Sequence, residues 1–204
     1  MAIVCDGTSD LCLQDIVEWI TDTAFPDQAF RIFPAREVIP AHSSLTDRLQ
    51  KAYNSYEPNI IVCHRDAETM SLEDRVFEIS TAQYALNLQI PVVPAVPVRM
   101  IESWLLTDEG AIRSAADNRN GKSDLNLPSH NTIEILKDPK EVLFSALKTA
   151  CGLPPQRLKK FNQNRARSRI ASFIKNFETL RALASFQKFE NRLVKAVMAL
   201  QDQK

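Results

Sequence analysis

The strongest constraint on the fold is a short apolar run, Ile-Ile-Val-Cys at residues 60–63, that is followed within five positions by Asp66 and Glu68. A continuous run of Ile and Val without polar alternation is typical of a strand buried on both faces of a parallel sheet. Open α/β sheets carry their chemistry just beyond the carboxyl ends of the strands. The run therefore predicts that both carboxylates lie at the functional edge of such a sheet.

A second stretch near the start of the chain repeats this arrangement. Residues 2–5 read Ala-Ile-Val-Cys, and Asp6 follows them directly. If the two strands lie side by side, Asp6 meets Asp66 and Glu68 at one edge. Three carboxylates in a small volume repel one another, and a hard divalent cation compensates that charge. The sequence thus predicts a Mg²⁺ (or Mn²⁺) site held by these three residues.

The order of the remaining elements indicates an α/β fold. Apolar runs at residues 29–33 and 90–96 are two further candidate strands, and amphipathic helical patterns lie between the four runs. The order β-α-β-α-β-α-β is typical of a parallel sheet covered by helices. Right-handed crossovers bring all the carboxyl ends to one edge. We therefore expect a parallel sheet of about four strands with a helical C-terminal extension.

The same patterns suggest three segments: an α/β domain at residues 1–116, a polar loop at 117–131 and a basic helical extension at 132–204 that packs on the domain. The segment 98–107 follows the fourth strand directly and is predicted to be helical. It carries Glu102, which is expected to approach the same edge as Asp66.

The charge of the chain is unevenly distributed, although the net charge is zero. Residues 142–204 hold 13 Lys and Arg against 3 Asp and Glu, and residues 142–177 hold no acid at all. Such a split suggests an anionic partner, with nucleic acid as the first candidate. The alternative is that the basic part packs against the acidic part. The candidate contacts are Lys159, Lys160, Arg165, Arg167 and Arg169.

Several features limit the class of protein. No apolar run approaches the roughly 20 residues that span a bilayer, and no signal-peptide pattern precedes the first strand. A cytoplasmic protein is the simplest interpretation. The chain has only four glycines and no glycine-rich phosphate loop, so an ATPase function would need a partner protein.

Two longer motifs resemble a known family. His-Arg-Asp-Ala-Glu at residues 64–68, followed by Arg-Met-Ile-Glu-Ser-Trp-Leu-Leu-Thr-Asp at 99–108, resembles a small prokaryotic Toprim-like family. Residues 180–189 also resemble the tail of that family, and some of its members look associated with anti-phage defence. Toprim domains cut, join or synthesise nucleic-acid backbones. The resemblance therefore implies a Toprim-like fold and a metal-dependent nuclease or related phosphoryl-transfer activity.

The resemblance also implies roles for individual residues. Asp6 stands where Toprim domains have an acidic general acid/base, usually Glu, and Asp66 and Glu68 stand where they have a metal-binding Asp-x-Asp. Asp6 is thus one methylene shorter than the common residue, and Glu68 is one longer. The two changes either compensate in reach or mark a site that binds metal without turnover. Glu102 is a further catalytic candidate.

Each of these residues also has a structural interpretation. Asp6 suits a turn, Asp66 and Glu68 suit the loop before a helix, and Glu102 suits the first turn of its own helix. Arg65 and Arg99 flank the expected edge and suit either phosphate binding or surface ion pairs.

Three functions remain open at this point. The first is a metal-dependent nuclease, which would act in anti-phage defence with a partner ATPase. The second is a non-catalytic module that binds nucleic acid or a protein partner. The third is an enzyme that acts on a small phosphorylated molecule.

Overall fold

The core of the protein is a parallel four-stranded sheet in the order β2-β1-β3-β4. The computed structural model describes residues 1–5, 12–35 and 43–202. The strands are β1 (Ala2–Val4), β2 (Phe33–Pro34), β3 (Ile61–His64) and β4 (Val92–Ala95). β1 pairs with both β2 and β3, and β3 pairs with β4. The predicted α/β class with four parallel strands is confirmed.

The edge strand β2 is shorter than the predicted run at residues 29–33. Its ladder includes Phe33 N donating to Met1 O and Ala35 N donating to Ile3 O. Pro34 lies between these two donors, and its missing N–H costs nothing because β2 is an edge strand. β4, the opposite edge, accommodates Pro94 in the same way.

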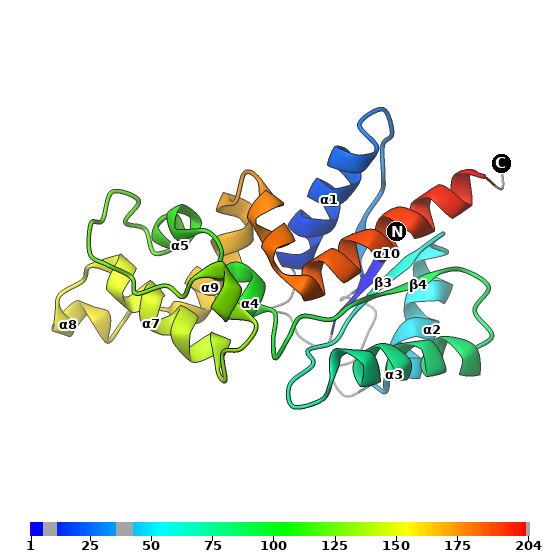
Figure 1. Cartoon of the computed structure of the whole chain (residues 1–204), viewed down its shortest axis with the longest axis horizontal. Helices are drawn as coiled ribbons and strands as arrows, with labels where there is room; N and C mark the ends of the chain where they lie inside the picture. The colour runs from blue at the N-terminus through cyan, green and yellow to red at the C-terminus, as the bar shows by residue number, and fades with distance from the viewer. Residues whose placement is uncertain (6–11, 36–42, 203–204) are drawn as a thin grey trace.

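The sheet separates two apolar layers (Figure 1). Ile3, Val62 and Val93 face the core that contains α1 (Cys12–Ala24) and α10 (Ala184–Gln201). The alternate strand residues, such as Ile61 and Val92, face the core beneath α2 (Leu45–Tyr56) and α3 (Leu72–Ala85). Period-two alternation along each strand thus assigns every buried strand residue to one layer.

A lobe of helices extends the α1 side of the molecule, at the left of Figure 1. The chain enters the lobe through the short α4 and leaves it through a 3-10 helix, η2, which leads into α10. The elements from α4 to η2 are α4 (Glu102–Leu105), α5 (Glu109–Ala115), α6 (His130–Ile133), α7 (Pro139–Cys151), α8 (Pro155–Leu158), α9 (Gln163–Phe173) and η2 (Phe177–Ala182). The lobe shares one continuous apolar core with the α1 face of the sheet, and α10 returns to pack over β4.

The predicted helix at residues 98–107 is reduced to the four residues of α4. Arg99 adopts a left-handed φ of 63°, and Met100 N donates to Val98 O in a tight turn. A left-handed residue cannot continue a right-handed helix, so the helix begins only after this turn.

Trp104 joins α4 to α10. It is fully buried, and its indole Nε1 donates to Ser185 Oγ at 3.0 Å. Its ring lies edge-on to Phe186 and stacks on Phe189, with ring centroids 5.5 and 5.7 Å apart. Trp104 is thus part of the core.

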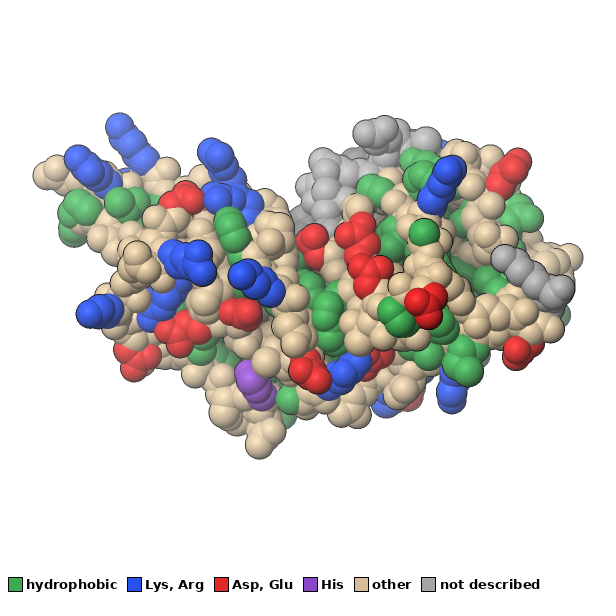
Figure 2. Space-filling view, turned by 90° about the horizontal axis from the view of Figure 1, so that it is seen from above, with side chains coloured by type: hydrophobic (Ala, Val, Ile, Leu, Met, Phe, Trp, Pro, Cys, Tyr) green, Lys and Arg blue, Asp and Glu red, His purple; other side chains and the backbone are tan. Residues whose placement is uncertain are grey.

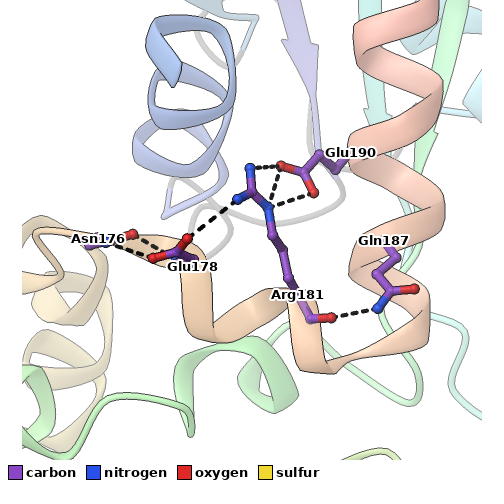
Figure 3. Close-up of polar contacts among 5 residues, drawn as sticks. All are labelled: Asn176, Glu178, Arg181, Gln187 and Glu190. Carbon is purple, nitrogen blue, oxygen red and sulfur yellow. Dashed lines mark hydrogen bonds and ion pairs between the residues drawn. The ribbon is translucent and has the colours of Figure 1, made fainter. Parts of the chain in front are cut away.

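Arg181 fixes the entry to α10 (Figure 3). Its guanidinium binds the Glu190 carboxylate through Nε at 3.0 Å and Nη2 at 2.7 Å, and Nη1 lies 3.8 Å from Glu178 Oε1. The carboxylate contact with Glu190 raises the pKa of Arg181. The guanidinium also lies over the Trp19 ring at 5.0 Å. Arg181 thus ties η2, α10 and α1 together.

Within the described residues, no helix has the length and apolarity to cross a membrane.

We expect Arg181→Ala to lower the free energy of unfolding by about 1–2 kcal/mol, because it removes a bidentate charged pair and a stacking contact. The measurement is urea denaturation followed by circular dichroism. Arg119→Ala, at an exposed position in the polar loop, is the matched control and should change stability by less than about 0.5 kcal/mol. Equal effects of the two substitutions would show that the network does not stabilise α10.

Candidate functional site

The topology of the sheet places its switch point between β1 and β3. The chain passes from β1 to β2 on one side, and β3 and β4 then extend the sheet on the other side of β1. α1 follows β1 and α3 follows β3, and these two helices lie on opposite faces of the sheet, so the connections leaving β1 and β3 diverge. Val4 and Cys63 are register partners at the ends of these strands. Ligand sites of open α/β sheets occupy this crevice. Asp6, which the sequence predicts here, lies outside the described residues.

The pairing of β3 with β4 continues beyond both strands. Arg65 N donates to Ala95 O, Ala67 N to Pro97 O, and Glu68 N to Arg99 O at 2.7 Å. The segment that carries Asp66 and Glu68 is therefore held by backbone hydrogen bonds rather than being a free loop. This places both carboxylates beside the turn that leads into α4.

Asp66 has a defined orientation and remains accessible. Its Oδ1 accepts a hydrogen bond from Ile101 N at 2.9 Å and lies 3.4 Å from Nε2 of His64. The Asp66 side chain is 33% exposed, whereas His64 is buried. His64 Nδ1 forms a hydrogen bond with Ala95 O at 3.0 Å. Asp66 is thus a fixed carboxylate that opens to solvent, which suits a ligand for a cation or a partly solvated substrate.

Glu68 lies toward α3. It adopts a left-handed φ of 52°, and its Oε2 lies 3.7 Å from Arg75 Nη2. Arg75 also pairs with Glu78, and Glu78 Oε1 lies 3.4 Å from Arg65 Nη2. The Glu68 side chain is 70% exposed, so it is free to change rotamer. Within the described parts of the chain, no three His, Cys, Asp or Glu side chains form a group that could hold a metal ion.

Two left-handed residues meet at this point of the site. Glu68 N donates to Arg99 O, Arg99 Nη1 donates to Glu68 O at 3.1 Å, and the φ of Arg99 is also positive. A left-handed conformation costs a non-glycine residue about 1 kcal/mol or more, and such residues cluster at functional sites. The pair sets the direction of the two chain segments that lie beside Asp66.

Glu102 forms a buried ion pair with Arg167. The distance from Oε1 to Nε is 3.0 Å, and both side chains are 4% exposed. Glu102 adjoins Ile101, whose N–H binds Asp66. The backbone of Glu102 thus lies at the predicted edge, while its carboxylate is engaged by α9 of the helical lobe. The pair connects the lobe directly to the site.

The predicted nucleic-acid contacts have different environments. Lys159, Lys160 and Arg165 are exposed on the lobe. Arg167 is buried against Glu102, so its predicted contact with a phosphate backbone is replaced here by the ion pair. Arg169 Nη1 lies 3.0 Å from Asp117 Oδ1, and its guanidinium covers the Phe173 ring.

The exposed lysines surround a hollow in the lobe. It measures about 690 Å³, and its lining includes Lys148, Lys159, Lys160 and Phe161 but no acidic residue. Figure 2 shows a group of Lys and Arg side chains over the lobe at the left, with several Asp and Glu side chains among them. The hollow therefore gives the lobe a basic surface whose lining includes an aromatic residue.

Of two ion pairs at the site, one could be identified from the sequence and the other could not. Arg167 was one cation among many in a basic segment, and nothing in its spacing pointed to Glu102. Arg75 is different, because Glu78 follows it at the i+3 position of a predicted helix, where oppositely charged residues meet.

Comparisons of the chain with family models, curated proteins and solved structures gave no match.

The Glu102–Arg167 pair should couple the lobe to the sheet. Removing one partner leaves a buried charge, so Glu102→Leu or Arg167→Met alone should destabilise the protein by about 3–5 kcal/mol. The double variant removes both charges, so neither is left buried opposite a neutral side chain. Its loss of unfolding free energy should therefore be smaller than the sum of the two single losses by at least about 1 kcal/mol. The measurement is a double-mutant cycle by urea denaturation.

The exposed Arg169–Asp117 pair is the matched control for this cycle. Both side chains are much more solvent-exposed than those of Glu102 and Arg167, so Arg169→Met should cost about 0–1 kcal/mol. Strictly additive losses at Glu102 and Arg167 would contradict the coupling.

Proposed function

We propose that the protein is a divalent-cation-dependent phosphoryl-transfer enzyme of Toprim-like type that cleaves phosphodiester bonds of nucleic acid. The proposal is carried by one observation. Asp66 lies beyond β3, next to the switch point of the sheet, and is held by Ile101 N–H with one third of its side chain exposed. An oriented and accessible carboxylate at this place in an open α/β sheet suits a ligand for a catalytic cation.

In this proposal, Asp66 and Glu68 supply the carboxylates for a Mg²⁺ or Mn²⁺ ion. Such ions bind through one or two carboxylates, retain several waters and take substrate phosphate as a further ligand. Oδ2 of Asp66 accepts no hydrogen bond from any described residue, and the exposed Glu68 is long enough to rotate toward the ion. When bound, the ion would neutralise phosphate oxygens and stabilise the attacking or leaving oxygen.

The other residues of the site have proposed roles around that ion. Arg65 and Arg99 flank Asp66 and would orient the phosphate by charge-assisted hydrogen bonds. Asp6 keeps its predicted role in accepting or donating a proton, or in completing the metal shell. Glu102, fixed by Arg167, would hold the backbone of Ile101 and hence the orientation of Asp66.

The basic surface of the lobe supports nucleic acid as the substrate. An acidic edge alone repels a polyanion, so a nuclease needs cations nearby to hold the backbone. The exposed Lys148, Lys159, Lys160 and Arg165 supply that charge, and α9 connects their surface to the site through Arg167. The resemblance to defence-associated proteins extends the proposal to a cytoplasmic role in anti-phage defence with a partner ATPase.

A non-catalytic binding module is the second candidate. It is favoured by the positions of the acids, because Glu68 lies toward Arg75 and Glu102 is paired with Arg167. In this alternative, the basic lobe would bind nucleic acid or an acidic protein, and the carboxylate edge would catalyse no reaction even with a cation bound.

Cation binding separates the two candidates. Calorimetric titration should show one Mg²⁺ or Mn²⁺ bound per chain, and Asp66→Asn should weaken binding by about tenfold or more and abolish cleavage of a labelled oligonucleotide. Asp22→Asn, at an exposed position at the C-terminal end of α1, is the control and should leave cation affinity and oligonucleotide cleavage unchanged. Cation binding without cleavage of single- or double-stranded DNA or RNA would favour the binding module.

The lobe should hold nucleic acid mainly by charge. Lys159→Glu with Lys160→Glu should weaken oligonucleotide binding and flatten its dependence on salt, because fewer counterions are released. The measurement is fluorescence anisotropy across a series of salt concentrations, with Mg²⁺ present.

The matched control is Lys51→Glu with Lys195→Glu. It changes the net charge equally at exposed positions on α2 and α10. Affinity should fall much less than for the lobe variant, and the salt slope should be retained. An equal effect of both double variants would assign the binding to net charge alone. If the wild type binds no oligonucleotide, nucleic acid is not the direct partner.

A further inference from the structure

The hydrogen bonds of His64 identify which ring nitrogen carries a proton. Its Nδ1 lies 3.0 Å from Ala95 O. A backbone carbonyl accepts hydrogen bonds and cannot donate one, so Nδ1 must carry the hydrogen. In the neutral imidazole, the lone pair is therefore on Nε2, the nitrogen that lies beside Asp66.

The spacing of Nε2 and Asp66 suits two ligands of one metal ion. The distance from Nε2 to Oδ1 is 3.4 Å. Metal–nitrogen and metal–oxygen bonds of about 2.0–2.2 Å, at angles between octahedral and tetrahedral, place neighbouring ligand atoms about 3.0–3.5 Å apart. The separation of the two atoms thus matches that of two neighbouring ligand atoms of one ion.

Both side chains are also held in place by further hydrogen bonds, as is usual for metal ligands. A coordinating histidine commonly donates its other ring N–H to a backbone carbonyl or carboxylate, which fixes the ring and its tautomer. Ala95 O provides this partner for His64, and Ile101 N–H fixes the Asp66 carboxylate. His64 is buried and Asp66 is 33% exposed, so an ion would enter from the Asp66 side.

We infer that Nε2 of His64 is a ligand of the cation at Asp66, which makes the site a mixed nitrogen–oxygen site for a divalent transition-metal ion. The inference rests on the cation site proposed above and adds a ligand to it. Mg²⁺ prefers oxygen ligands and water, whereas imidazole favours transition-metal ions. Mn²⁺ should therefore bind more tightly than Mg²⁺, by about tenfold, because only Mn²⁺ gains from the nitrogen.

Pulsed electron paramagnetic resonance of the Mn²⁺-loaded protein tests this ligand directly. Electron spin echo modulation from a directly coordinated imidazole nitrogen should be present in the wild type and absent in His64→Asn. Asn is chosen because its amide can replace the Nδ1 donor to Ala95 O while removing Nε2. Calorimetry on the same samples should show Mn²⁺ affinity reduced about tenfold or more and Mg²⁺ affinity changed by less than about twofold.

The controls are the other two histidines of the chain, His42 and His130. His42→Asn and His130→Asn should each retain the nitrogen modulation, which assigns the signal to His64 even if His64→Asn fails to fold. Mn²⁺ binding without nitrogen modulation in the wild type would overturn the inference and leave the proposed cation site intact. If no Mn²⁺ binds at all, both the nitrogen ligand and the proposed cation site are wrong.

Discussion

The backbone pairing of β3 with β4, continued past the ends of both strands, is the constraint on which the candidate site depends. It extends to the hydrogen bond between Glu68 N and Arg99 O, and both residues have positive φ values. The turn after Arg99 directs the N–H of Ile101 to the Asp66 carboxylate. Without this pairing, Asp66 would lie on an ordinary surface loop and its carboxylate would have no fixed direction.

The same turn determines how the helical lobe is attached. Glu102 follows Ile101 and forms its buried ion pair with Arg167, and Trp104 packs between Phe186 and Phe189 one turn later. These residues thus connect the sheet edge, the lobe and α10. A buried ion pair offers little net stability, since desolvation offsets much of the attraction, but it strongly disfavours other arrangements of these elements. The pair therefore specifies the position of the lobe more than it stabilises the fold.

The charge asymmetry of the chain is explained by this architecture in part only. Some cations of the C-terminal region neutralise acids elsewhere, as Lys188 does with Glu73 and Arg169 with Asp117. Others remain exposed around the hollow that includes Lys159 and Lys160. The two explanations of the basic segment, internal packing and binding of an anionic partner, therefore apply to different residues of the same segment.

The sequence by itself determined the class of fold, because short apolar runs and amphipathic helices alternate in an order that only a helix-covered parallel sheet satisfies. It also located Asp66 at the carboxyl end of β3, since a strand and the residue after it are local features. Only the tertiary structure decided the partners of Glu102 and His64, because the contacts of Glu102 with Arg167 and of His64 with Ala95 join segments separated by long stretches of chain. Periodicity carries no information about such contacts, whereas backbone pairing and burial determine them.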